Sequence, residues 1–206
     1  MAYRTAIFDF DGTIGDPGPA ISDSLLFTLK SYGYGSIPIG PHEYIGPPLG
    51  MTLKKILPEA DPEEALKVFR RHFVEHGLKL YKPYPGIPEL LELLSSRQEV
   101  SLRIATSKPT GYARSILKDF GLLELFERVV GASMAQIDYS KEILVKEALV
   151  GCREPAIMVG DSEHDIAAAK ANGIDSVFVA YGCGRFATQP TFIAKDATEL
   201  KRIILQ

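Results

Sequence analysis

Hydrophobic and polar positions follow two different periods along the chain. Short runs of β-branched and aromatic residues predict buried strands, and segments with an apolar residue every three or four positions predict amphipathic helices. Over most of the chain these segments alternate with short connections, so we expect an α/β fold in which helices cover both faces of a parallel sheet. The expected strands are residues 3–9, 100–105, 128–131, 156–159, 176–179 and 191–194. The expected helices around them are residues 87–96, 112–120, 141–150, 164–172 and 197–205.

One helical block interrupts this alternation after the first expected strand. It contains three segments with a helical period, which are residues 20–31, 52–57 and 62–81. The sequences DPGP at residues 16–19 and YKPYP at residues 81–85 bracket the block, and their prolines predict linkers. We therefore expect a helical domain of residues 16–83 inserted into a core domain of residues 1–15 and 84–206.

The composition narrows the class of protein. The 206 residues are 46% apolar and 24% charged, which is ordinary for a globular protein with a sizeable core. A net charge of -3 argues against nucleic-acid binding, which needs a basic surface. Cys152 and Cys183 fit reduced thiols in a cytoplasmic protein better than a disulfide framework. No apolar run approaches the roughly 18 residues of a membrane span, so we expect a soluble protein with no membrane partner.

Polar residues follow three of the expected strands directly. Ligands of an open parallel sheet bind beyond the carboxyl ends of its strands, so we expect these residues to share one site. They are Asp9, Asp11 and Thr13 after the first strand, Thr106, Ser107 and Lys108 after the second, and Gly160, Asp161, Ser162 and Asp165 after residues 156–159, with Lys141 at the start of a helix. Acids as close as Asp9 and Asp11 repel each other at the end of a buried strand, which predicts a nearby cation.

Clustered carboxylates at a sheet edge indicate a hard divalent cation. Mg²⁺ prefers oxygen ligands, and Asp9 with Asp161 would hold it, joined by the main-chain carbonyl of Asp11. The histidines offer no competing metal site, because their spacing matches no ligand motif. They are His42, His72, His76 and His164.

The remaining polar groups suit a phosphate. The Thr106 hydroxyl and the Lys141 ammonium would bind its oxygens, the lysine as a compact point charge. Gly12 would let backbone N–H groups approach the phosphate closely. Lys108 and Lys146 compete with Lys141 for this role, and we rank them after it.

Four sequence motifs resemble those of the haloacid-dehalogenase-like phosphatase superfamily. They are DFDGT at residues 9–13, the threonine of IATSKP, the lysine of YSKEIL, and VGDSEHD at residues 159–165. The four motifs occur in the same order as in that superfamily, and the resemblance covers essentially the whole chain. The combination of DxDGT with a later GDxxxD is specific to few protein families. The helical block, with EYIGPPL inside it, resembles the cap of the phosphoglycolate-phosphatase-like subgroup. The resemblance implies a Rossmann-like core with a small helical cap.

The resemblance also implies a role for each site residue. Asp9 is the nucleophile that forms an aspartyl-phosphate, and Asp11 is the acid that protonates the leaving oxygen and then takes a proton from water. The implied metal ligands are Asp9, Asp11 and Asp161, the implied phosphate-binding residues are Thr106, Ser107 and Lys141, and Gly12, Thr13 and Asp165 support them. Asp165 is a further ligand or orients Lys141. Asp16 has no expected catalytic role, because the first motif departs from the common pattern there.

We therefore predict a Mg²⁺-dependent phosphoric monoester hydrolase that acts on a small phosphorylated metabolite. Phosphoglycolate and nucleoside 5′-monophosphates are candidate substrates by resemblance. The helical domain should close as a lid, with residues 43–50 near the leaving group. Three alternatives remain: a sugar-phosphate phosphomutase that uses the same aspartates, a dehalogenase, which Asp11 argues against, and a catalytically silent binding module. The protein would be a monomer or a homodimer.

Overall fold

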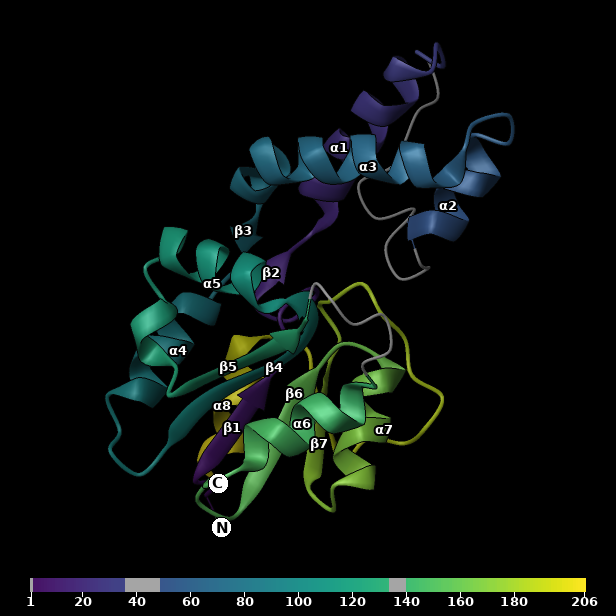
Figure 1. Cartoon of the computed structure of the whole chain (residues 1–206). Coiled ribbons are helices and arrows are strands. Elements are labelled where there is room, and N and C mark those ends of the chain that lie inside the picture. The colour runs from purple at the N-terminus through teal and green to yellow at the C-terminus, as the bar shows by residue number, and fades with distance from the viewer. Residues whose placement is uncertain (1, 36–48, 134–139) are drawn as a thin grey trace. The chain divides into compact units, whose positions relative to one another are not determined.

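A six-stranded parallel sheet forms the centre of the larger part of the chain (Figure 1). This computed structural model describes residues 2–35, 49–133 and 140–206. The strands lie in the order β5-β4-β1-β6-β7-β8, and each neighbouring pair is parallel, which confirms the predicted α/β class. Their bounds are β1 Thr5–Phe8, β4 Ser101–Pro109, β5 Arg128–Ala132, β6 Ala156–Gly160, β7 Asp175–Val179 and β8 Phe192–Ala194.

Strand β1 occupies the middle of the sheet, between β4 and β6. All four of its residues are buried, as expected for a continuous apolar strand that is covered on both faces. Ile7 pairs with Arg103 of β4 and with Met158 of β6. Because the three strands are parallel, their carboxyl ends meet at one edge of the sheet, and this brings the segments after β1 and β6 together.

Helices cover both faces of the sheet (Figure 1). Helices α6 and α7 pack on one face, where Leu144 and Val145 join Ile7 and Met158 in a buried cluster. Helices α4 and α8 pack against each other on the opposite face. The bounds are α4 Ile87–Ser95, α5 Thr110–Asp119, η2 Leu123–Leu125, α6 Lys141–Leu149, α7 Glu163–Ala171 and α8 Ala197–Leu205. Within the described ranges, no helix has the length and apolarity needed to cross a membrane.

The contacts between Cα atoms divide the chain into two compact units. One comprises Met1–Asp16 and Pro83–Gln206, and the other is Pro17–Lys82. The second unit is helical, with a core that includes Leu25, Leu53 and Phe69. Its elements are α1 Gly18–Ser31, α2 Leu49–Ile56, α3 Pro62–Glu75 and the short 3-10 helix η1 Gly77–Leu80.

Three details of this helical unit and of the segments that flank it differ from the sequence prediction. The DPGP segment is not a simple linker, because α1 begins at Gly18 directly after Pro17, where the fixed φ of proline suits the start of a helix. Short strands β2 (Gly15–Asp16) and β3 (Lys82–Pro83) also pair with each other in place of two free linkers. The helix predicted over residues 62–81 ends at Glu75. A Cβ at the following Gly77 would lie 3.0 Å from the side chains of Phe73 and Ser24, so a larger residue here would have to displace them slightly.

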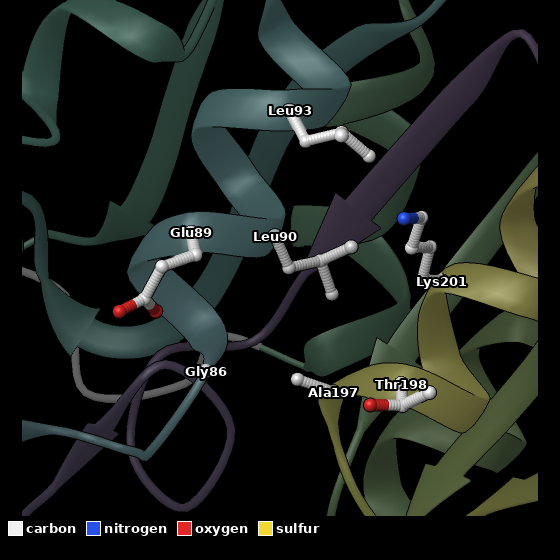
Figure 2. A pocket seen from close by; sticks show the side chains of 7 residues that line it. All are labelled: Gly86, Glu89, Leu90, Leu93, Ala197, Thr198 and Lys201. Atoms are coloured by element: carbon white, nitrogen blue, oxygen red, sulfur yellow. The ribbon is translucent and has the colours of Figure 1, made fainter.

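A pocket of about 320 Å³ lies between α4 and α8 (Figure 2). Its lining residues are Gly86, Glu89, Leu90, Leu93, Ala197, Thr198 and Lys201. None of the site residues predicted from the sequence lines it. The clustered acids and lysines therefore lie outside this pocket.

The buried Arg103 side chain joins strand β4 to the end of α6. Its Nη1 donates to the carbonyls of Ala148 (2.8 Å) and Val150 (2.9 Å), and its Nη2 donates to Gly151 O and to Glu127 Oε1, both at 3.0 Å. Only 2% of the arginine side chain is exposed. The last carbonyls of a helix lack partners within the helix, and Arg103 supplies donors for that end of α6.

Replacing Arg103 with Met should lower the free energy of unfolding by about 2–4 kcal/mol, because buried carbonyls lose their donors. Urea denaturation followed by circular dichroism measures the change. Arg128→Met is the matched control, because Arg128 is exposed and donates to the carbonyl of Glu147 at 2.9 Å, and we expect an effect below about 1 kcal/mol. Equal losses in the two variants would contradict this account of Arg103.

Candidate active site

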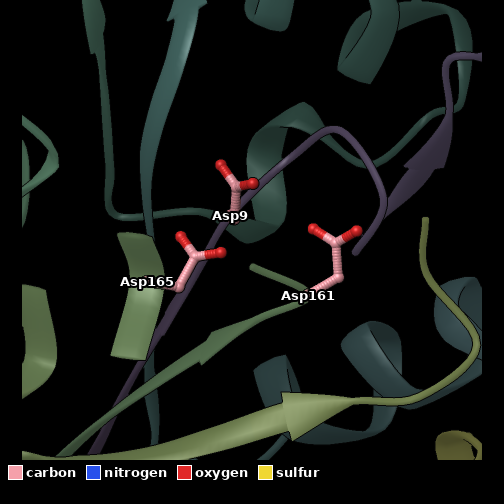
Figure 3. A group of neighbouring side chains, drawn as sticks. All are labelled: Asp9, Asp161 and Asp165. Carbon is pink, nitrogen blue, oxygen red and sulfur yellow. The ribbon is translucent and has the colours of Figure 1, made fainter. Parts of the chain in front are cut away.

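Three buried carboxylates gather at the carboxyl edge of the sheet (Figure 3). Asp9 follows β1, Asp161 follows β6, and Asp165 lies in the first turn of α7. One oxygen of each residue lies within 4.8 Å of the other two, and none of the three residues is more than 8% exposed. Like charges at this separation and burial are strongly unfavourable without a cation, so the cluster needs positive charge.

Lys141, the first residue of α6, supplies part of that positive charge. Its Nζ lies 2.5 Å from Asp9 Oδ1 and 2.8 Å from Asp165 Oδ1. Burial alone would lower the pKa of Lys141, but the charges of Asp165 and Asp9 outweigh burial and raise its pKa, so the ammonium is firmly protonated. Lys146 lies exposed on the same helix and makes no such contact in the described structure.

One lysine does not neutralise the cluster. Burial raises the pKa of Asp9 to about 7 although Lys141 opposes the shift, and the charge of Asp165 adds to it. Burial and Asp165 likewise raise the pKa of Asp161 to about 6, against the main-chain N–H groups of Gly184 and Cys183. Near neutral pH, Asp9 of the metal-free protein is therefore partly protonated, and a further cation would displace that proton.

Asp11 lies beside this group and pairs with a second lysine. Lys108 Nζ donates to Asp11 Oδ2 at 2.8 Å, and the Lys108 side chain is only 5% exposed. Asp11 Oδ1 is buried and has no hydrogen-bond partner within the described ranges. Asp165, rather than the Asp11 side chain, completes the close set of three carboxylates. Asp165 Oδ1 lies 2.8 Å from Lys141 Nζ, and its expected role, to orient Lys141 or to bind the metal, stays a prediction.

In the turn after β1, Gly12 has a steric role that the sequence did not suggest. Its φ is +84°, and a Cβ at this position would lie 2.2 Å from Asp161 Oδ2. The absence of a side chain therefore makes room for the Asp161 carboxylate. The Gly12 N–H donates to Gly15 O at 3.0 Å, and its predicted approach to a phosphate stays a prediction.

The threonines and the serine of the predicted site differ in burial. Thr13 and Thr106 are buried, while Ser107 is exposed. The Thr106 hydroxyl accepts the N–H of Lys108 at 3.2 Å, within the last part of β4, where the pairing with β5 shifts register between Thr106 and Pro109. Thr13 Oγ1 has no hydrogen-bond partner in the part of the chain that the structure describes. The roles of all three in phosphate binding stay predictions.

Sequence reasoning missed a loop that contacts the acidic cluster. After β7, the main-chain N–H groups of Cys183 and Gly184 each donate to Asp161 Oδ2 at 2.8 Å. The signal in the sequence is YGCG at residues 181–184, because closely spaced glycines let a main chain approach a side chain. That signal is weak without the fold, since glycine pairs also occur in ordinary turns.

The family of the chain follows from these motifs together with comparison to known proteins. The family model for haloacid dehalogenase-like hydrolases matches residues 6–179. The chain belongs to this hydrolase family. This confirms the family predicted from the four motifs.

Individual relatives of this hydrolase carry several different names. A 5′-nucleotidase of Pseudomonas aeruginosa is 33% identical over 99% of this chain and 96% of its own length. A phosphoglycolate phosphatase of Aquifex aeolicus is 31% identical over 98% of this chain and 96% of its own length. The solved structure of Protein Tyrosine Kinase A (PtkA) of Mycobacterium tuberculosis has a TM-score of 0.85 and 33% identity, and the match covers 98% of each chain.

The donor set of this hydrolase fits a hard divalent cation. The close ligand atoms all come from carboxylates, and a group of buried oxygen ligands is what Mg²⁺-type cations require. The wider site contains more negative than positive side chains. It comprises the carboxylates of Asp9, Asp11, Asp161 and Asp165 and the ammonium groups of Lys108 and Lys141. When all are ionised, four negative and two positive charges leave -2, which a divalent cation offsets.

A divalent cation should stabilise the hydrolase more at high pH than at low pH. Raised carboxyl pKa values mean that the folded state binds protons more tightly than the unfolded state, so stability from these acids falls as pH rises from about 4 through 7. The cation binds the ionised acids and competes with protons. Addition of MgCl₂ should therefore raise Tm more at about pH 8 than at about pH 5.5.

Differential scanning calorimetry of the metal-free protein measures this difference. Asp161→Asn should remove most of the MgCl₂ effect, whereas Asp119→Asn, at an exposed position on α5, should keep it. The same Tm increase at both pH values would show that the buried acids do not bind the cation.

Proposed function

We propose that this hydrolase is a Mg²⁺-dependent phosphatase that hydrolyses a small phosphomonoester through an aspartyl-phosphate. The observation that carries the proposal is the environment of Asp9. This acid directly follows the central strand β1, Lys141 lies 2.5 Å from its Oδ1, and oxygens of two further buried carboxylates lie within 4.8 Å. A carboxylate held in this way is a suitable nucleophile for phosphorus.

The first step forms a bond between an oxygen of Asp9 and phosphorus and breaks the bond to the leaving oxygen. Lys141, with Thr106 and Ser107, binds the phosphoryl oxygens, over which negative charge is spread during transfer. Asp161, Asp9 and the main-chain carbonyl of Asp11 hold Mg²⁺, and Asp165 orients Lys141 or adds a ligand. When bound, Mg²⁺ offsets the negative charge shared by Asp9 and the phosphate.

Asp11 acts as the general acid of the first step and as the general base of the second. It gives a proton to the leaving oxygen and later takes one from the water that attacks the aspartyl-phosphate, so the enzyme returns to its starting state. Once Asp11 has given up its proton, its carboxylate is ionised. Lys108 Nζ, 2.8 Å from Asp11 Oδ2, stabilises that ionised form.

The helical unit would serve as the cap that selects the substrate. We propose a core of residues 1–15 and 84–206 and a cap of residues 16–83, which closes over the site and excludes water from the first step. Residues 43–48 of the expected substrate loop lie outside the described residues. The relatives named 5′-nucleotidase and phosphoglycolate phosphatase support nucleoside 5′-monophosphates and phosphoglycolate as substrates to test.

Asp9→Asn should abolish phosphatase activity, with a loss of at least about 10³-fold in kcat, because the amide is a poor nucleophile. Release of p-nitrophenol from p-nitrophenyl phosphate with MgCl₂ measures activity, and EDTA should stop it. Asp119→Asn is the matched control and should keep wild-type activity. Turnover by a folded Asp9→Asn variant would remove the nucleophile assignment. A phosphomutase would instead interconvert hexose phosphates with a bisphosphate activator and release little phosphate.

Substitutions of the two lysines of helix α6 should have very different effects on kcat/KM. Lys141→Gln should lower kcat/KM by about 10²–10³-fold, since a buried cation that faces the developing charge is lost. Lys146→Gln, at an exposed position on the same helix, should change it less than about twofold. Steady-state kinetics with p-nitrophenyl phosphate measure kcat/KM of both variants. If Lys141→Gln keeps wild-type kcat/KM, phosphate binding must be assigned to another residue, with Lys108 the next candidate.

A further inference from the structure

We infer that residues 181–184 form a positioning element for Asp161, in which two main-chain N–H groups fix one carboxylate oxygen and so set the orientation of the other for the cation. The inference rests on the proposed role of Asp161 as a metal ligand. Cys183 and Gly184 donate to the same oxygen, Oδ2, at 2.8 Å each. Hydrogen bonds to an ionised carboxylate are strong, so two of them restrict the orientation of Asp161 more than one would.

Only glycines let this loop lie so close to Asp161. A Cβ at Gly184 would lie 2.2 Å from the main-chain oxygen of Asp161. A Cβ at Gly182 would lie 2.3 Å from Asp161 Cβ and 2.4 Å from the main-chain oxygen of Gly12. The atoms that such a Cβ would meet belong to the main chain or are the Cβ of a side chain, and they cannot rotate away. A substitution of either glycine must therefore move the loop. A loop that moves takes its two N–H groups away from Asp161.

Two tyrosines connect the same loop to its surroundings in the core unit. The Tyr181 hydroxyl donates to the main-chain oxygen of Thr13 at 3.0 Å, in the turn that carries Asp11. The ring of Tyr84 lies 5.0 Å from that of Tyr181, and its hydroxyl lies 3.5 Å from Cys183 Sγ. The loop therefore links the segment after β1 with the segment after β6, which carry the proposed nucleophile and the metal ligand.

The physical effect of this arrangement is on affinity for the cation. Because the two N–H groups hold Asp161 Oδ2, they fix the position of its other carboxylate oxygen before a cation binds. Groups that orient metal ligands typically change metal affinity by about 10–100-fold when they are removed. Neither N–H group touches the substrate in this scheme, so the loop should act on cation binding and leave substrate binding unchanged.

Calorimetric titration of the metal-free protein with MgCl₂ tests the inference without any substrate. Gly184→Ala should raise the Kd for Mg²⁺ by about 10–100-fold. Tyr181→Phe removes a single hydroxyl and should raise it by about 2–5-fold. Gly111→Ala is the matched glycine control, because a Cβ there meets no atom within 4 Å, and it should bind as the wild type does.

Steady-state kinetics supply a second measurement, the MgCl₂ concentration for half activation. A residue with a merely structural role would not change this concentration. At saturating MgCl₂, kcat of Gly184→Ala should recover and its KM for p-nitrophenyl phosphate should match the wild type, while the MgCl₂ concentration for half activation stays high. A simple loss of stability would lower Tm without shifting that concentration. If Gly184→Ala does not fold, Tyr181→Phe decides the question.

The outcomes separate this inference from the proposed function. Wild-type protein that does not bind Mg²⁺, or Asp161→Asn that binds it as tightly as wild type does, would overturn the proposed metal site and the inference with it. If Asp161→Asn loses binding while folded Gly184→Ala and Tyr181→Phe keep wild-type affinity, the loop does not position Asp161. The inference is then wrong and the proposed function stands.

Discussion

Repulsion among buried carboxylates is the constraint on which the rest of this structure depends. One oxygen each of Asp9, Asp161 and Asp165 lies within 4.8 Å of the others, and the three residues are buried, so water screens their charges poorly. Lys141 contacts two of them, yet the pKa of Asp9 remains raised to about 7. The core unit therefore holds a concentration of negative charge that is unfavourable in isolation and favourable for a cation and a phosphoryl group.

The fold maintains this unfavourable group by anchoring each acid from a different element. Asp9 is fixed by β1, whose residues are all buried, and its N–H donates to Val159 O of β6 at 2.8 Å. Asp165 Oδ2 accepts the N–H and the hydroxyl of Ser162, at 3.0 and 2.6 Å. These hydrogen bonds and the packing of the surrounding elements hold the acids in place against their local repulsion. A preorganised site of this kind needs little rearrangement when charge develops during a reaction.

Sequence alone predicted the parts of this arrangement that depend on local pattern. The apolar run that ends at Asp9 identifies a strand, and a parallel sheet brings the ends of its strands together, so the meeting of Asp9 with Asp161 follows from topology. The start of α1 at Gly18 was missed because the prolines of DPGP read as a linker, although proline also suits the first turn of a helix.

Contacts that depend on the path of a loop could not be predicted in the same way. The partner of Lys108 is Asp11, and nothing in the spacing of these residues distinguishes this pair from a Lys108 that binds phosphate. The loop at residues 181–184 reaches Asp161 through main-chain N–H groups, which have no signature in side-chain chemistry. Such contacts become visible only when the turns after β1, β6 and β7 are placed in space.

A crystal structure with MgCl₂ and beryllium trifluoride, a mimic of the phosphoryl group, tests the central claim most directly. The account predicts that the beryllium is bonded to an Asp9 oxygen, that Mg²⁺ is coordinated by Asp9, Asp161 and the main-chain oxygen of Asp11, and that Lys141 contacts the fluorides. Mg²⁺ bound elsewhere, or beryllium trifluoride absent from Asp9 in a crystal that contains both, would contradict it.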